Sequence, residues 1–248
     1  MTRHTLTAFV VIVLLSAASA HAQVTKYVRY QSDGRIAYGV LEGDTVRELN
    51  GDPFTSPAPT GRAMKLAAVK LLAPCEPRKV IAVGLNYKSH LGERPTAKYP
   101  GLFAKLPTSI IGPDDTIVYP DGASNVHFEG EMVLVIGKRA RNVTSSQAAE
   151  YVFGVTAGND VSERDWQKQD LQWFRAKASD TFGPLGPVIV RGVDYDDLLL
   201  QTRLNGEVVQ SQRTKDLIFN VSAIVSYISQ FVTLEPGDVI YTGTPGAT

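Results

Sequence analysis

Alternation of apolar and polar residues along the chain predicts a protein built mainly from β-strands. Residues 27–49 (YVRYQSDGRIAYGVLEGDTVREL) alternate in this way, and the triplets Ser-Asp-Gly and Glu-Gly-Asp interrupt them, which indicates a small antiparallel meander. Residues 198–211 form a predicted β-hairpin around Asn205-Gly206, because this dipeptide accepts the positive φ angles of a type I′ turn. Further strands are expected at residues 79–83, 126–136 and 239–242.

Capping motifs and apolar residues at helical spacing predict a few helices between these strands. Thr144-Ser-Ser-Gln147 has the pattern of a capping box, so a short helix is expected to run to Phe153 and to stop at Gly154. Ser162-Glu-Arg-Asp165 begins a second helix in the same way. A third helix is expected from the helical stripe of Leu217, Val221, Ile224, Val225, Ile228 and Phe231. Strands and helices do not alternate regularly, so the predicted class is α+β rather than doubly wound α/β.

The composition is that of a folded protein whose main partner is not nucleic acid. Of the 248 residues, 44% are apolar and 20% are charged, which allows a sizeable core. Lys and Arg number 25, as do Asp and Glu, and this balance lacks the surplus of basic charge that phosphate binding requires. The single cysteine, Cys75, excludes an intramolecular disulfide and a metal site built from cysteines.

The first 22 residues (MTRHTLTAFVVIVLLSAASAHA) have the layout of a secretory signal peptide. A short basic start precedes an apolar stretch, and small residues lead to Ala22. A buried N-terminal helix and an uncleaved anchor are the alternatives. Cleavage after Ala22 predicts an exported protein, periplasmic or secreted, which has no membrane contact afterwards because no later segment is long and apolar enough to span a bilayer. It leaves two histidines in the mature chain, His90 and His127.

Two glutamates stand at the start of the longest predicted strand, in His127-Phe-Glu129-Gly-Glu131. Side chains alternate along a strand, so positions 127, 129 and 131 are expected on one face. The apolar residues that follow indicate a strand buried on both faces, where two unpaired carboxylates would cost several kcal/mol. A hard divalent cation such as Mg²⁺ would remove that cost. The alternative is a solvated strand end whose glutamates face water or pair with Lys or Arg.

Three other groups carry candidate chemistry. Asp160 lies at the end of an apolar stretch just before the second predicted helix, where an Asp is most often a plain cap. Lys177 follows bulky apolar residues, so it is either desolvated or extends along the surface to water. His90 and Glu93 have i, i+3 spacing, and on a helical turn the carboxylate would orient the imidazole as a general base. A surface histidine beside a chance glutamate is the alternative.

Together these strings resemble the fumarylacetoacetate hydrolase family over residues 79–248. The matching pieces are Gly84-Leu-Asn-Tyr-Lys-Ser-His90, Pro100-Gly-Leu-Phe-Ala-Lys105, His127-Phe-Glu-Gly-Glu131, Gly158-Asn-Asp160, Arg164-Asp-Trp-Gln167, Lys177, Phe182-Gly-Pro-Leu-Gly-Pro187, Asn205-Gly-Glu207 and Thr242-Gly-Thr-Pro245. The resemblance implies a β-rich mixed roll with flanking helices, in a homodimer. The chain is then expected to divide into the signal peptide (1–22), a small N-terminal β-rich region with a linker (23–78) and a catalytic domain (79–248).

The resemblance also implies a role for each matching residue. Glu129, Glu131 and Asp160 would bind Mg²⁺ or Mn²⁺, and oxygen ligands suit both ions. Lys177 would lie beside the bound substrate, and His90 with Glu93 would activate a water. Arg164, Gln167 and Thr244 would contact substrate oxygens.

The function expected from these residues is hydrolysis of a C–C bond in an acylpyruvate-like 1,3-dicarbonyl acid, through an enolate that the metal and Lys177 stabilise. A decarboxylase, isomerase or hydratase of 2-oxo dicarboxylic acids is the first alternative, since the same site would serve it. A non-catalytic exported binding protein is the second.

Family members typically continue past Thr-Gly-Thr-Pro into further strands, whereas this sequence ends with Gly246-Ala-Thr248. We expect either a fragment or a sheet without its closing strands.

Overall fold

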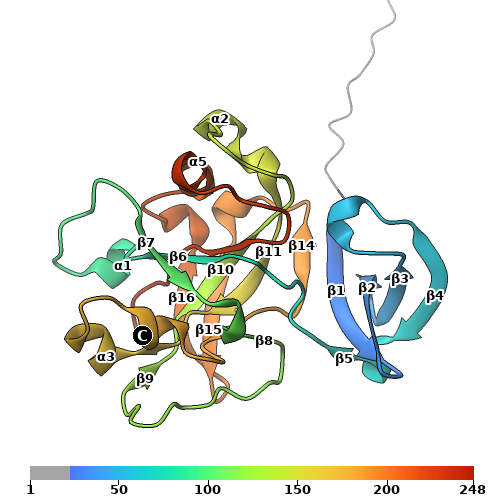
Figure 1. Ribbon diagram of the computed structural model, residues 1–248, viewed down its shortest axis with the longest axis horizontal. Helices are drawn as coiled ribbons and strands as arrows, with labels where there is room; N and C mark the ends of the chain where they lie inside the picture. The colour runs from blue at the N-terminus through green and yellow to red at the C-terminus, as the bar shows by residue number, and fades with distance from the viewer. Residues whose placement is uncertain (1–22) are drawn as a thin grey trace, which may run out of the picture.

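The computed structural model describes residues 23–248, and strands form most of its regular structure (Figure 1). The strands are β1 (Thr25–Ser32), β2 (Arg35–Glu42), β3 (Thr45–Leu49), β4 (Pro59–Lys65), β5 (Lys70–Leu71), β6 (Val80–Gly84), β7 (Gly101–Lys105), β8 (Ile110–Ile111), β9 (Val126–His127), β10 (Gly130–Ile136), β11 (Val152–Asn159), β12 (Ser162–Glu163), β13 (Gly183–Pro184), β14 (Ile189–Arg191), β15 (Leu199–Leu204), β16 (Glu207–Arg213) and β17 (Val239–Tyr241). The α-helices are α1 (Lys88–Leu91), α2 (Ser145–Ala148), α3 (Arg164–Gln169), α4 (Phe174–Ala178) and α5 (Val221–Phe231).

One large mixed sheet runs through the described residues in the order β4-β3-β2-β1-β14-β11-β10-β17-β6-β7, with β5 beside β1. Strands β17 and β6 are parallel, and the other neighbours in this sheet are antiparallel. Figure 1 shows β1 to β4 gathered at one side of the molecule, joined to the rest through β1 and β14. This strand-rich sheet with few helices confirms the predicted α+β class.

The central strand β10 is buried on both of its faces, which explains its unbroken apolar sequence. Met132, Leu134 and Ile136 pack in a cluster with the apolar side of α5, which begins at the Asn220 cap. Figure 1 shows α5 and α2 side by side over this part of the sheet. Val133 and Val135 point the other way, into a second cluster that includes residues of β6 and β17. The two clusters fix the strand that carries the paired glutamates.

The long strand predicted at residues 126–136 is wrong in one respect, because it is broken into β9 and β10. His127 pairs with Ser162 in a separate two-stranded sheet, and its Nε2 lies 2.9 Å from Asn125 Oδ1. At the break, the Glu129 backbone N–H donates to Asn159 Oδ1, and its carbonyl accepts from the Asp160 N–H. Strand alternation predicts that His127 shares a face with the two glutamates, but in the structure His127 lines a different cavity from theirs.

Other predicted elements differ mainly at their ends. The meander and the hairpin are confirmed, and Asn205 and Gly206 have φ angles of 52° and 89° as the turn requires. The helix expected from Ser162 begins at Arg164, because the Glu163 carboxylate accepts the hydrogen bond of the Trp166 N–H and caps it. The helix expected to reach Phe153 is cut short, since β11 begins at Val152.

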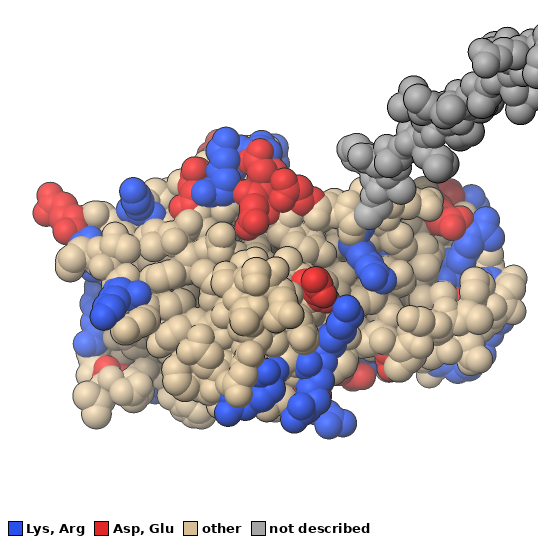
Figure 2. All heavy atoms as spheres, turned by 90° about the horizontal axis from the view of Figure 1, so that it is seen from above, with Lys and Arg blue, Asp and Glu red and all other residues tan. Residues whose placement is uncertain are grey.

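Charged side chains of both signs are spread over the surface, and the helices are short. On the face in Figure 2, Lys and Arg side chains are interspersed with Asp and Glu, and broad uncharged areas separate them. Within residues 23–248, no helix has the length and apolarity needed to traverse a lipid bilayer.

Candidate functional site

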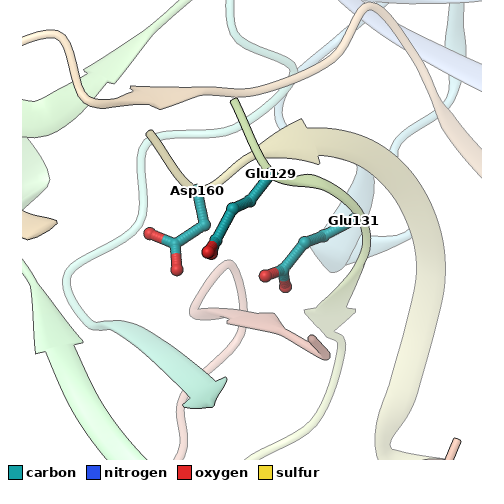
Figure 3. Close-up of side chains that lie close together, drawn as sticks. All are labelled: Glu129, Glu131 and Asp160. Atoms are coloured by element: carbon teal, nitrogen blue, oxygen red, sulfur yellow. The ribbon is translucent and has the colours of Figure 1, made fainter. Parts of the chain in front are cut away.

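Three carboxylates from two neighbouring strands converge in the interior. Glu129 immediately precedes β10, Glu131 lies in β10, and Asp160 immediately follows β11. Because β10 and β11 are paired with Gly130 opposite Asn159, the start of one strand meets the end of the other. One oxygen from each carboxylate lies within 4.8 Å of the other two, and all three side chains are buried (Figure 3). The structure thus brings together the residues that the sequence suggested as metal ligands.

Glu131 is the member of this cluster with the fewest partners. Its Oε2 accepts a hydrogen bond of 2.6 Å from the Gly243 N–H, and no Lys or Arg within residues 23–248 forms an ion pair with it. Burial raises the pKa of Glu131 well above its ordinary value, and the charges of Asp160 and Glu129 raise it further. A buried carboxylate without a counter-ion costs several kcal/mol. The donor set of three hard oxygens therefore fits Mg²⁺ or Mn²⁺.

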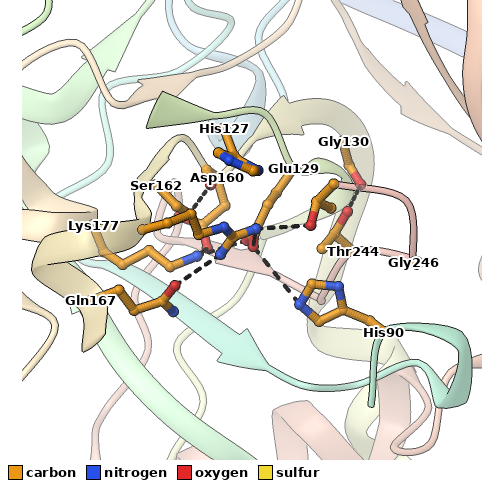
Figure 4. A network of polar contacts seen from close by, with 12 residues as sticks. His90, His127, Glu129, Gly130, Asp160, Ser162, Gln167, Lys177, Thr244 and Gly246 are labelled. Carbon is orange, nitrogen blue, oxygen red and sulfur yellow. Dashed lines mark hydrogen bonds and ion pairs between the residues drawn. The ribbon is translucent and has the colours of Figure 1, made fainter. Parts of the chain in front are cut away.

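Two buried lysines balance the other two carboxylates. The Nζ of Lys177, which comes from α4, lies 2.7 Å from Glu129 Oε2 and 2.7 Å from Asp160 Oδ2 (Figure 4). Lys105, at the end of β7, lies 2.7 Å through its Nζ from Asp160 Oδ1 and also donates to the backbone carbonyl of Lys177. Burial alone would raise the pKa of Asp160, but these two ammonium groups hold it below its ordinary value. Burial lowers the pKa of Lys105, whereas Asp160 and Glu129 outweigh burial and raise that of Lys177.

Sequence reasoning gave Lys105 no role. The available signal was weak: a lysine that ends a short strand otherwise made of glycine and apolar residues. Only the pairing of β7 with β6 carries its ammonium group to Asp160.

His90 reaches the site, but its predicted partner does not. The His90 Nε2 lies 3.9 Å from Glu129 Oε1. Burial of the ring lowers the pKa of His90, and the negative charge of Glu129 offsets only part of that effect. Helix α1 ends at Leu91, and Gly92 turns the chain at φ 62°, so Glu93 does not lie over His90 as i, i+3 spacing on a helix requires. The Glu93 side chain is exposed, and no hydrogen bond or ion pair joins it to His90 in the described chain. The helical dyad predicted from the sequence is not formed.

The residues predicted to contact substrate lie on the other sides of the cluster. Arg164, at the start of α3, lies 2.6 Å through its Nη2 from Glu129 Oε1, and its Nη1 donates to Gln167 Oε1 at 2.9 Å. Thr244, just after β17, is buried and donates from its Oγ1 to the Gly130 carbonyl at 2.9 Å. Arg164 thus contacts a carboxylate directly, Gln167 is held by Arg164, and Thr244 is held by the glycine between the two glutamates.

Gln210, in β16, is a second residue that sequence reasoning missed. Its Oε1 accepts hydrogen bonds from the Gly130 N–H at 3.1 Å and from Thr202 Oγ1 at 2.7 Å. Its Nε2 donates to Thr244 Oγ1 at 2.9 Å and to the Pro245 carbonyl at 3.0 Å. This one buried amide therefore ties the glycine between the two glutamates to the loop that carries Thr244. A glutamine in an exposed-looking hairpin gives no such signal in the sequence.

Known proteins of similar sequence and structure include enzymes. Over 184 residues the chain is 44% identical to the mitochondrial oxaloacetate tautomerase Fahd2a of Rattus norvegicus, a match that covers 71% of this chain and 59% of that protein. The crystal structure of 5-carboxymethyl-2-hydroxymuconate delta-isomerase from Mycobacterium smegmatis superposes with a TM-score of 0.85 and 44% identity, covering 90% of this chain and 89% of that one. The maleylpyruvate hydrolase of Sphingobium sp. SYK-6, in complex with manganese(II) and pyruvate, superposes at 0.73 with 27% identity, covering 90% and 89%.

The prediction of an exported protein is wrong on this comparison. The tautomerase from Rattus norvegicus that aligns with 71% of the chain is a mitochondrial protein. The layout of basic, apolar and small residues on which the prediction depended is a compositional pattern only. The predicted signal peptide, residues 1–22, lies outside the described residues.

The family models agree with the geometry. A model described as Rv2993c-like, N-terminal, matches residues 25–74. The model of the fumarylacetoacetate (FAA) hydrolase C-terminal domain matches residues 79–248, the part of the chain that contains the carboxylate cluster, both lysines and His90. The resemblance found in the sequence is confirmed: this chain belongs to the fumarylacetoacetate hydrolase family.

Proposed function

We propose that the protein is a divalent-metal-dependent enzyme that interconverts the keto and enol forms, or the double-bond isomers, of a 2-oxo acid. The observation that carries this proposal is one buried cavity lined by the three carboxylates together with Lys177 and His90. The reaction needs a site for negative charge on oxygen and a group that moves a proton at the neighbouring carbon. The tautomerase and isomerase among the similar proteins support the same reaction class.

The residues would divide this work. A Mg²⁺ or Mn²⁺ ion held by Glu129, Glu131 and Asp160 would supply Lewis acidity toward the carbonyl oxygen of the substrate. Lys177 presents an ammonium group that stabilises negative charge on that oxygen as the proton leaves carbon. His90 lies at the same cavity and accepts the proton from carbon, and a proton delivered to oxygen completes the enol without net gain or loss of atoms.

The test uses oxaloacetate as the probe. Purified protein with Mg²⁺ or Mn²⁺ is mixed with the enol form, and the loss of enol absorbance is followed while pyruvate is measured separately. We expect metal-dependent loss of the enol signal without pyruvate release, and a large decrease of the rate in Lys177→Met. Exposed Lys26→Met serves as the matched control. A rate that equals that of buffer with the same metal would contradict the proposal.

Hydrolysis of a C–C bond is the second candidate, favoured by the likeness to the maleylpyruvate hydrolase. It requires an activated water, and His90 has no contact with Glu93 that would orient it as a base. Acetylpyruvate is the discriminating substrate: metal-dependent release of pyruvate would favour hydrolysis over tautomerisation.

We also propose that the protein is a homodimer. The hairpin formed by β15 and β16 exposes Leu199, Leu204 and Val208, of which Leu199 is 56% exposed. Exposed apolar residues gathered on one element are typical of a surface that another protein chain covers.

A further inference from the structure

A second cavity of about 330 Å³ adjoins the carboxylate cavity. The two share four lining residues, namely Gly84, Leu85, Phe103 and Trp173. Phe103 and Trp173 meet edge to face with their ring centroids 5.5 Å apart, and Lys177 Nζ lies 5.2 Å from the Phe103 centroid. A substrate whose reacting end lies at Lys177 would therefore extend past these two rings into the second cavity.

The second cavity is lined without a charged side chain. Besides the four shared residues, its lining consists of Gly101, Leu102, Leu171 and Gln172. Leu171 is 96% exposed, so this leucine stands at the opening with its apolar surface in water. Burial of an apolar chain would remove that surface from water, which is favourable, whereas a carboxylate would meet no cation there.

Two glycines in the lining have different roles: one makes room for Trp173, and the other leaves space in the cavity. Gly84 and Gly101 lie opposite each other in β6 and β7, and neither has a positive φ, so the backbone conformation does not require glycine at either position. A Cβ on Gly84 would lie 3.2 Å from Trp173 Cζ3, so the indole occupies that space. A Cβ on Gly101 would meet only the Gly84 carbonyl at 3.6 Å, an ordinary contact. The missing side chain at Gly101 is therefore free space in the cavity.

We propose that this second cavity, called here the distal subsite, binds an uncharged alkyl or acyl chain of the substrate. Resting on the proposed function, the inference extends the substrate class to longer 2-oxo acids, and among these it favours an apolar tail of several carbons over a tail that ends in a second carboxylate. The Mycobacterium smegmatis relative is named for a substrate with a carboxymethyl group. The two proteins would therefore differ in whether they accept a charged group at the distal end of the substrate.

The test compares matched substrates on the wild-type chain loaded with Mn²⁺. We expect kcat/KM to rise by about 10-fold or more from 2,4-dioxopentanoate to 2,4-dioxoheptanoate, because each added methylene is buried. 2,4-Dioxoheptanedioate has the same length with a second carboxylate, and it should be turned over no better than the five-carbon acid. Equal or better turnover of the dioate would overturn the distal subsite while leaving the proposed reaction intact.

The affinities of the two seven-carbon acids, measured by calorimetry, distinguish an error in the proposed subsite from an error in the proposed reaction. If neither these acids nor oxaloacetate is turned over, the proposed function fails. Tighter binding of 2,4-dioxoheptanoate than of 2,4-dioxoheptanedioate would then still support the subsite. Equal or weaker binding of 2,4-dioxoheptanoate would overturn it.

Two variants test the lining directly. Gly101→Leu fills the subsite, so the ratio of kcat/KM for the seven-carbon acid to that for the five-carbon acid should fall about 10-fold. Leu171→Arg adds a cation at the opening, so the kcat/KM ratio of 2,4-dioxoheptanedioate to 2,4-dioxoheptanoate should rise about 10-fold. Ile36→Arg places the same charge on an exposed strand residue of the N-terminal region and should leave that ratio unchanged. If the two variants fold with wild-type melting temperatures and neither ratio moves, the proposal is wrong.

Discussion

Glu131 combines burial with a shortage of positive partners, and this determines how the metal-free protein should respond to pH. Its raised pKa means that the folded chain holds the proton more tightly than the unfolded chain does. The free energy of unfolding should therefore fall as pH rises above the ordinary value of 4.5 and the carboxyl is forced to ionise. Glu131→Gln removes that charge.

We predict that, without metal, Glu131→Gln is more stable than the wild type at pH 7, by on the order of 1 kcal/mol, and that the difference shrinks toward pH 4. Urea unfolding in the presence of a chelator measures both values. A variant that is less stable than the wild type at pH 7 would show that Glu131 is adequately paired without an ion.

Gln210 should act on the site through hydrogen bonds alone. Gln210→Leu leaves the Gly130 N–H, the Thr202 hydroxyl and the Pro245 carbonyl without their partner, at a cost of about 2–4 kcal/mol in the free energy of unfolding. Because Gly130 lies between the two glutamates, we also expect the affinity for Mn²⁺ to fall. Thr202→Val removes only one bond to the same oxygen and should cost about 1 kcal/mol. Equal Mn²⁺ affinity in Gln210→Leu and the wild type would limit Gln210 to a role in stability.

At the scale of elements, local patterns predicted strands well and their ends poorly. The meander and the hairpin depend on Asn205, Gly206 and similar turn residues, whose effect is local. The break before β10 depends instead on Asn159, far along the chain, whose side chain takes the Glu129 N–H. Long-range hydrogen bonds of this kind leave no periodic pattern in the sequence. Strand alternation alone therefore predicts His127 on the same face as the glutamates.

In the candidate site too, local spacing predicts some residues, whereas others are brought in only by long-range contacts. The spacing of Glu129 and Glu131 pointed to a buried pair of acids, and the family resemblance supplied Asp160. Lys105 could not be assigned, because its contact with Asp160 exists only once β7 has paired with β6. The pairing of His90 with Glu93 failed because a four-residue helix ends before Glu93.

Helix α3, which carries Arg164 and Gln167, depends on the cap at Glu163. This carboxylate accepts the N–H groups of Trp166 at 2.6 Å and Asn125 at 2.9 Å. Burial would raise the pKa of Glu163, but these backbone hydrogen bonds hold it below its ordinary value. The stabilisation is present above the unfolded value of 4.5 and is lost as pH falls through the lower folded value.

We therefore expect Glu163→Gln to lower the free energy of unfolding by about 1 kcal/mol at pH 7, with a difference that shrinks as pH falls below 4.5. Denaturant titrations at several pH values measure it. Glu150→Gln, an exposed glutamate near α2, is the matched control and should have little effect. A difference that persists unchanged at pH 3 would rule out the charged cap as its cause.

At the scale of the whole molecule, β1 and β14 join the N-terminal strands to the sheet that carries the acids. The homodimer proposed above places its apolar contact on the β15–β16 hairpin. Light scattering after size exclusion should give about twice the chain mass of 26.9 kDa, and Leu199→Arg with Leu204→Arg should shift it toward one chain. A mass near 26.9 kDa for the wild type at micromolar concentrations would contradict a stable dimer.

Binding of a divalent ion at the three converging acids underlies the proposed reaction. Calorimetric titration of the purified chain with Mn²⁺ is the most direct test, with Glu129→Gln and His90→Ala titrated beside it. We predict one ion per chain for the wild type and for His90→Ala, and loss of that binding in Glu129→Gln. Wild-type affinity in Glu129→Gln, with its fold intact by circular dichroism, would contradict the assignment of these carboxylates as the metal site.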